Sequence, residues 1–248
     1  MTPLMRRLIL IVLFPMVASA GPLFVRGSLG FERTAGVHVR DLDCSSAEPP
    51  ALFGCVAGND QRALGAYGDF GRGPAFELAL GRSLSRARLE LALAHRQLDL
   101  DADANFIGVG GAQPVRGDVR SSAAFLNAAV DLAPWRVRPF VVAGAGLAHN
   151  EIGAVRYEFP GISPEAVTVL AGGTHTDFAW SAGAGAAIEL SPSLALDVVW
   201  RWSDLGEVRT EDGPATIVRP NRELEIDIAG TRADLETSGV SVSLRWRR

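Results

Sequence analysis

The sequence predicts an all-β fold, an eight-stranded antiparallel up-and-down transmembrane β-barrel with four long external loops and three short periplasmic turns. Three observations predict it. Eight segments carry apolar residues at every second position, short and long connections alternate between them, and aromatic residues gather near the segment ends. Since successive side chains of a strand point to opposite faces, a period of two indicates strands.

The first four segments span residues 23–32, 75–81, 87–96 and 123–132. Each has an uncharged apolar row on one face and a row with polar or charged residues on the other. The apolar rows are Leu23, Val25, Leu29 and Phe31; Phe76, Leu78 and Leu80; Ala87, Leu89, Leu91 and Leu93; and Ala124, Leu126, Ala128, Val130 and Leu132.

The last four segments span residues 135–148, 178–190, 194–203 and 240–246 and follow the same scheme. Their apolar rows are Trp135, Val137, Val141, Ala143, Ala145 and Leu147; Phe178, Trp180, Ala182, Ala184, Ala186, Ile188 and Leu190; Leu194, Leu196, Val198, Trp200 and Trp202; and Val240, Val242, Leu244 and Trp246.

The connections decide which face meets the membrane. Residues 83–86, 133–134 and 191–193 form short turns, whereas 33–73, 97–122, 149–177 and 204–239 are long. Short periplasmic turns with long external loops are typical of outer-membrane barrels, in which the apolar row faces lipid. A soluble ligand-binding barrel is the weaker alternative, because it does not explain this alternation. Within 204–239, alternation of Leu224, Ile226 and Ile228 predicts a hairpin beyond the membrane.

Aromatic residues provide an independent test, because Trp and Tyr favour the two membrane–water boundaries. With both ends of the barrel chain periplasmic, two girdles are expected. The external girdle comprises Phe31, Phe76, Phe178, Trp180, Trp200 and Trp202, and the periplasmic girdle comprises Trp135 and Trp246.

Residues 1–20 resemble a cleavable export signal, which leaves 21–248 as the barrel domain. Arg6 and Arg7 precede an apolar stretch that is too short to span a membrane, and Ala18-Ser19-Ala20 offers a cleavage site. Export would place Cys44 and Cys55 in an oxidising compartment. A disulfide in the first external loop is therefore favoured, and two free thiols are the alternative.

The inward-facing rows contain basic and acidic side chains in nearly equal number. A barrel of eight strands is only wide enough for side chains to fill it, so we expect a salt-bridged structural network; the alternative is a narrow ion path lined by the same groups. The expected members are Arg26, Glu32, Glu77, Arg88, Glu90, Arg96, Asp131, Arg136, Arg138, Glu189, Asp197, Arg201 and Arg245.

Three segments, 21–30, 138–148 and 179–190, resemble strands of the opacity-type, porin-like outer-membrane barrels, a family that includes adhesins and surface antigens. The resemblance spans 21–248 and implies a barrel of eight strands in the outer membrane of a Gram-negative bacterium. It also implies recognition by the barrel assembly machinery, for which Trp246 would be the displaced C-terminal aromatic signal.

The leading functional hypothesis is a non-enzymatic surface barrel, structural or adhesin-like, that binds a host or environmental ligand through its long loops. A narrow ion or small-solute pore is the second hypothesis, and a lipid-modifying outer-membrane enzyme is the third. We expect contact with membrane lipid and lipopolysaccharide. The net charge of −4 argues against nucleic acid, and we expect no catalytic residues, cofactor or metal.

Overall fold

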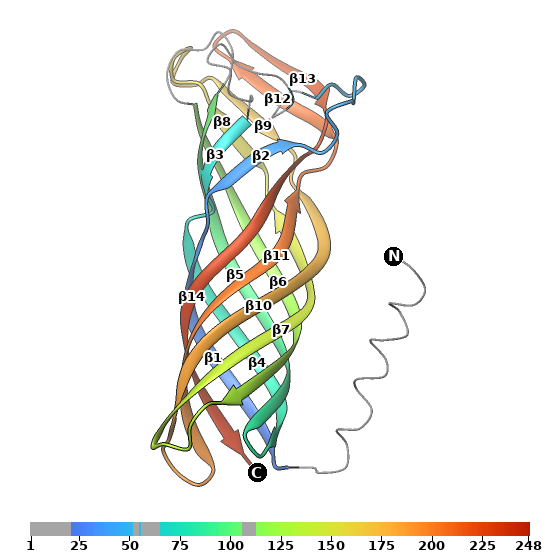
Figure 1. Ribbon diagram of the computed structural model, residues 1–248. Coiled ribbons are helices and arrows are strands. Elements are labelled where there is room, and N and C mark those ends of the chain that lie inside the picture. Colours follow the sequence, from blue (N-terminus) through green and yellow to red (C-terminus); the bar gives the residue numbers. More distant parts are fainter. Residues whose placement is uncertain (1–20, 52–54, 56–64, 106–112) are drawn as a thin grey trace, which may run out of the picture.

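The computed structural model describes residues 21–51, 55, 65–105 and 113–248 as a tall barrel (Figure 1). The predicted export signal lies outside the described residues. Among those residues, no helix is long and apolar enough to cross a membrane. All regular structure in the described ranges consists of β-strands, joined in a single antiparallel sheet.

Eight long strands form a closed ring, which confirms the predicted fold class. In order around the ring they are β1 (Leu23–Thr34), β4 (Arg72–Leu84), β5 (Ala87–Asn105), β6 (Gln113–Asp131), β7 (Val137–Ile152), β10 (Gly173–Glu189), β11 (Leu194–Arg209) and β14 (Thr231–Arg247). Pairing of β14 with β1 closes the barrel. The short turns and the C-terminus lie at one end (Figure 1).

The register fixes the tilt of the strands. Starting at Val25 on β1 and moving from each residue to its register partner on the next strand of the ring, the path reaches Glu236 on β14. The carbonyl of Glu236 accepts a hydrogen bond from the amide of Ala35, back on the chain that follows β1. One circuit therefore advances ten residues along the chain, from Val25 to Ala35. A stagger of this size inclines the strands by about 40° to the barrel axis.

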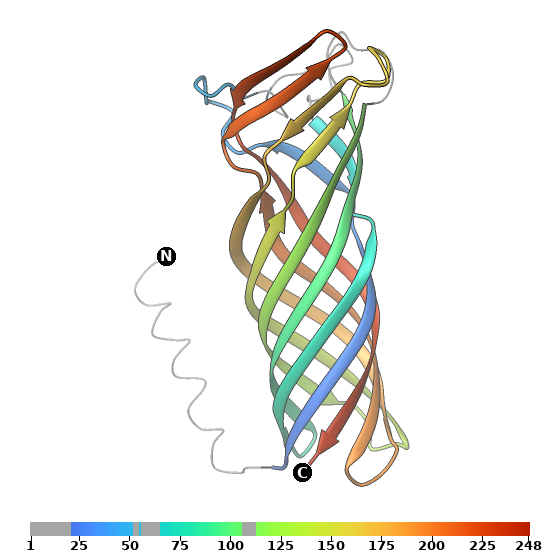
Figure 2. The same cartoon turned by 180° about the vertical axis from the view of Figure 1, so that it is seen from behind.

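Six shorter strands extend the sheet at the end opposite the short turns (Figures 1 and 2). They are β2 (Val37–Asp41), β3 (Gly65–Asp69), β8 (Val155–Glu158), β9 (Val167–Leu170), β12 (Gly213–Arg219) and β13 (Arg222–Ile228). β2 and β3 fill the space between β14 and β5, whereas β8, β9, β12 and β13 continue outward from β6. The predicted hairpin is the β12–β13 pair.

The two faces of the long strands exchange polarity at one level. On β5, Leu91 and Leu93 are exposed on the outer face, and from His95 onward that face is polar. The inner face changes in the opposite sense, because Arg96 is followed by the buried Leu98 and Leu100. The lower part of the strand thus suits a lipid exterior, and the upper part suits an aqueous one.

This exchange explains why the predicted strand ends are wrong. Alternation with an apolar outer row ends near residue 96, yet β5 continues to Asn105 and β6 begins at Gln113 instead of residue 123. The predicted loops 33–73, 97–122, 149–177 and 204–239 consequently contain strand rather than loop alone. Nine further residues on a strand tilted by about 40° raise the end of β5 roughly 23 Å above residue 96.

Candidate functional site

The lower lumen holds a network of charged side chains. Glu77 lies between two arginines: its Oε1 is 2.5 Å from Arg26 Nη2, and its Oε2 is 2.6 Å from Arg201 Nη1. Arg26 also donates from Nε to Glu90 Oε2 over 3.0 Å, and Asn127 donates to the same carboxylate over 3.0 Å. The network therefore links β1, β4, β5, β6 and β11 across the barrel.

A second group centres on Asp197. Arg245 donates from Nε and Nη2 to the two carboxylate oxygens, each over 3.0 Å, in a bidentate pair. Arg88 Nη1 lies 3.4 Å from Asp197, and its Nη2 lies 3.1 Å from Asp131. The Arg88 guanidinium also lies over the ring of Phe140, 4.4 Å from the ring centre. Every charge in this group has an opposite partner, as burial requires.

The remaining pairs lie above and below these two groups. Arg96 Nε lies 2.7 Å from Glu32 Oε2 near the upper limit of the charged region. At the periplasmic end, Arg138 and Arg247 both pair with Glu189. Arg247 is absent from the predicted set. It lies two residues beyond Arg245 on β14, and this spacing is the signal that identifies it as a member of the inward row.

Arg136 is the one predicted member that the structure places elsewhere. It is exposed in the connection between β6 and β7, outside the barrel interior. The expected alternation fails there because β7 begins only at Val137, so Arg136 has no strand to orient it inward. The other twelve predicted residues all form ion pairs inside the barrel.

Apolar side chains fill the lumen above the charged region. They include Phe125, Val119, Leu98, Leu100, Ile152 and Leu205, each with 5% or less of its surface exposed. A cavity of about 1170 Å³ is lined mostly by outward side chains such as Leu29 and Leu147, together with Ser28 and Glu77 of the inner face. Two further cavities beside the inner face are much smaller, with about 20 Å³ beside Glu77 and Arg201 and about 10 Å³ beside Leu100. Such volumes hold about one water molecule at most. Two successive layers, one charged and one apolar, thus close the barrel.

Asn150 is a buried polar residue that the sequence pattern does not reveal. Pairing between β10 and β11 ends at Trp180 and Asp204, and β11 has a register irregularity between Asp204 and Glu207. Asn150 Nδ2 reaches from β7 and donates to the carbonyls of Leu205 and Glu207 over 2.8 and 3.1 Å. Its amide therefore replaces strand-to-strand bonds that β10 does not supply.

All the predicted girdle residues lie on the outer surface. Phe31, Phe76, Phe178, Trp180, Trp200 and Trp202 lie toward the external end of the apolar band, and Trp135 and Trp246 lie at the end with the short turns. Trp180 and Trp202 form an edge-to-face pair with ring centres 4.6 Å apart. From Leu23 to Phe31 the band is about 20 Å tall, close to the thickness of a barrel's lipid-facing zone.

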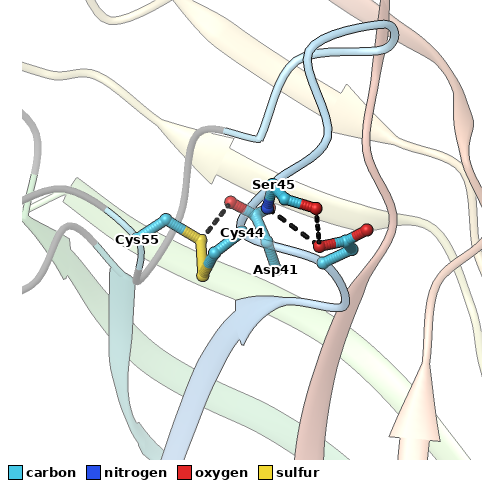
Figure 3. The surroundings of a disulfide bond; sticks show 5 residues. Asp41, Cys44, Ser45 and Cys55 are labelled. Atoms are coloured by element: carbon cyan, nitrogen blue, oxygen red, sulfur yellow. Dashed lines mark hydrogen bonds between the residues drawn. A yellow bond between two sulfur atoms is a disulfide. The ribbon is translucent and has the colours of Figure 1, made fainter.

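The structure joins Cys44 and Cys55 in a disulfide at the outer end of the barrel (Figure 3). Sγ of Cys55 lies 3.5 Å from Oδ2 of the buried Asp41, the last residue of β2. Beside it, the Asp43 carboxylate accepts hydrogen bonds from the backbone amide and hydroxyl of Ser45. The cysteines thus close a short loop above the ring.

The outer tip carries the β12–β13 hairpin, whose second strand is largely exposed. Leu224 is 48% exposed, and Glu223, Glu225 and Asp227 give this strand an acidic row. Arg219 donates to the carbonyl of Val167 over 2.9 Å and so ties the hairpin to β9. The hairpin presents an apolar and acidic surface well above the membrane-facing band (Figure 2).

Tyr157 of β8 and His38 of β2, both in the outer segments, have shifted pKa values. Complete burial, and then the nearby Asp41 carboxylate, raise the pKa of Tyr157 well above its ordinary value. Partial burial, and then the positive charge of Arg40, lower the pKa of His38, whose ring stacks on Tyr67 at 4.2 Å. Among the described residues, no three His, Cys, Asp or Glu side chains form a cluster suited to a metal ion.

No protein-family model matches the chain, and no curated protein matches it. Several solved structures have similar folds. The outer membrane protease OmpT from Escherichia coli is 9% identical, with a TM-score of 0.56, covering 94% of this chain and 99% of OmpT. The outer membrane protein OprG from Pseudomonas aeruginosa is 10% identical, with a TM-score of 0.50 and coverage of 92% and 98%. The chain therefore has the fold of the bacterial outer-membrane β-barrels.

Proposed function

We propose that this protein is a non-enzymatic surface barrel of the outer membrane, structural or adhesin-like, whose recognition surface is the extended outer end. The observation that carries the proposal is the closed lumen. The charged network fills the membrane-spanning half of the barrel, and an apolar layer that includes Phe125 and Leu100 fills the half above it. Contact with other molecules is then left to the outer surface.

The closed lumen favours this function over a pore. An ion crossing the barrel would have to separate pairs such as Arg245 with Asp197, both 2% exposed or less, and breaking one buried pair costs about 3–5 kcal/mol. It would then meet the layer of buried apolar side chains, where burying an unpaired charge is costly. A conducting path would require both layers to rearrange.

Planar-bilayer conductance tests the proposal. Purified protein whose folding is verified by its heat-dependent gel mobility is expected to give no stable unitary current steps. Reproducible steps of one size would support the pore and contradict the surface-barrel function. A variant with Leu100→Asp and Asp197→Ala, which weakens both layers, serves as a control that the assay detects an opened lumen.

The enzymatic alternative has a separate test. OmpT is a protease, yet a likeness at 9% identity concerns the fold alone. Mass analysis of lipid A from cells with and without the protein is expected to show the same species. A modified species that appears only with expression would support the lipid-modifying enzyme instead.

A further inference from the structure

Two exposed arginines lie side by side on the outer face, just above the external girdle. Arg33 of β1 is the direct register partner of Arg72 of β4. Like charges directly opposite each other destabilise a sheet. Within the described ranges, neither arginine forms an ion pair, so no carboxylate of those residues relieves their mutual repulsion through an ion pair.

A second pair of opposed arginines shows the contrast. Arg116 of β6 is the register partner of Arg156 of β8, and both are exposed. Here each has its own carboxylate, because Arg116 pairs with Asp101 and Arg156 Nε lies 3.4 Å from Glu158. The charges of Arg116 and Arg156 are thus neutralised by carboxylates of the protein. The charges of Arg33 and Arg72 remain available to an external anion.

A cavity of about 390 Å³ opens beside Arg33 and Arg72. Trp202, Ser238 and Arg33 are successive register partners on β11, β14 and β1, so an indole, a hydroxyl and a guanidinium line one continuous wall. Asp69 also lines the cavity, and one of its carboxylate oxygens accepts the Gly71 amide over 2.7 Å. Two positive charges against one negative leave the lining net positive.

The height of the cavity relative to the membrane indicates which kind of ligand reaches it. Phe31 lies two residues below Arg33 on β1, and Phe76 lies four residues below Arg72 on β4. Aromatic girdles mark the level of the lipid headgroups, so the two guanidinium groups lie where the phosphates of the outer leaflet are expected. Paired guanidinium groups suit phosphate, and the indole offers an apolar surface to a sugar ring.

We propose that this cavity binds the phosphorylated sugar headgroup of an outer-leaflet glycolipid. The volume falls in the range of small-molecule sites, and the lining matches each part of such a headgroup. The site is separate from the outer tip, so it adds to the proposed function without depending on a partner at the β12–β13 hairpin.

The test measures the affinity of folded, detergent-solubilised protein for diphosphoryl lipid A in mixed micelles. The Arg33→Gln/Arg72→Gln variant is expected to bind at least tenfold more weakly, a change of about 1.4 kcal/mol. The Arg116→Gln/Arg156→Gln variant removes the same charge from the neutralised pair and is the matched control, expected to bind as the unaltered protein does. Heat-dependent gel mobility verifies folding, and the single substitutions replace any double variant that fails it.

Two further probes identify the source of the anion. Dephosphorylated lipid A is expected to bind weakly and equally to the unaltered protein and to the Arg33→Gln/Arg72→Gln variant. Inorganic phosphate at millimolar concentration is expected to compete poorly, because it makes no contact with Trp202. Equal binding of diphosphoryl lipid A by the unaltered protein and both double variants would overturn the proposal, as would complete competition by free phosphate.

Discussion

Replacing Asp197 with asparagine should greatly destabilise the barrel. Asp197 is 1% exposed, and both of its oxygens accept hydrogen bonds from Arg245, which is 2% exposed. Among the described residues, Arg245 has no other carboxylate partner, whereas Arg88 keeps Asp131. Removing one partner of a buried ion pair lowers the free energy of unfolding by about 3–5 kcal/mol, and we expect a loss of that size.

Urea unfolding in lipid vesicles, followed by tryptophan fluorescence, measures this loss. Asp101→Asn is the matched control, because it removes a carboxylate from the exposed pair with Arg116 and should cost at most about 1 kcal/mol. The Asp197→Leu/Arg245→Leu variant should recover most of the stability, since it leaves no unpaired charge at this pair. Equal, small losses for Asp197→Asn and Asp101→Asn would refute the buried network.

Three further predictions concern the outer face and the outer end. Leu91→Arg should lower the free energy of unfolding in vesicles by about 2–4 kcal/mol, because it places a charge in the lipid-facing band. Asp99→Arg lies above that band on the same face of β5 and should change the free energy of unfolding by less than about 0.5 kcal/mol. Equal effects of the two substitutions would contradict a membrane boundary between residues 91 and 99. Because burial lowers the pKa of His38, its neutral form is favoured in the folded protein, so stability is full above pH 6.5 and declines below it. Protection of the β2 amides, corrected for the intrinsic exchange rate at each pH, should therefore fall from pH 6.5 to 5, and not in His38→Gln. Reduction of Cys44–Cys55 should expose residues 42–51 to protease without altering the heat-dependent gel mobility.

The ring of eight strands could be predicted because lipid imposes one rule on every outward row, namely that its side chains are apolar. Leu89, Leu91 and Leu93 satisfy that rule, and the strand they define is present. The upper strands could not be predicted by it, because above the membrane the apolar residues turn inward. Leu98 and Leu100 continue the same strand on the opposite face, so a search for one uninterrupted apolar row stops at residue 96.

The composition of the lumen was predictable, but its pairing was not. Alternation places Glu77 and Arg201 on the inward face, yet only the closed ring brings together residues 124 positions apart. Arg33 and Arg72 fall within the predicted loop 33–73, outside the segments of predicted outward alternation. The sequence did contain a signal for Arg33, because it lies two residues beyond Phe31 and so continues the outward row of β1.

The orientation of the barrel, with its extended end outside the cell, is tested most directly by labelling intact cells with a membrane-impermeant thiol reagent. Asp101→Cys places a thiol on the exposed upper face of β5, and Ser193→Cys places one in the exposed turn between β10 and β11. The native cysteines are joined in a disulfide and do not react. We predict labelling of Asp101→Cys in intact cells and of Ser193→Cys only after the outer membrane is permeabilised. Labelling of Ser193→Cys alone in intact cells would contradict the account.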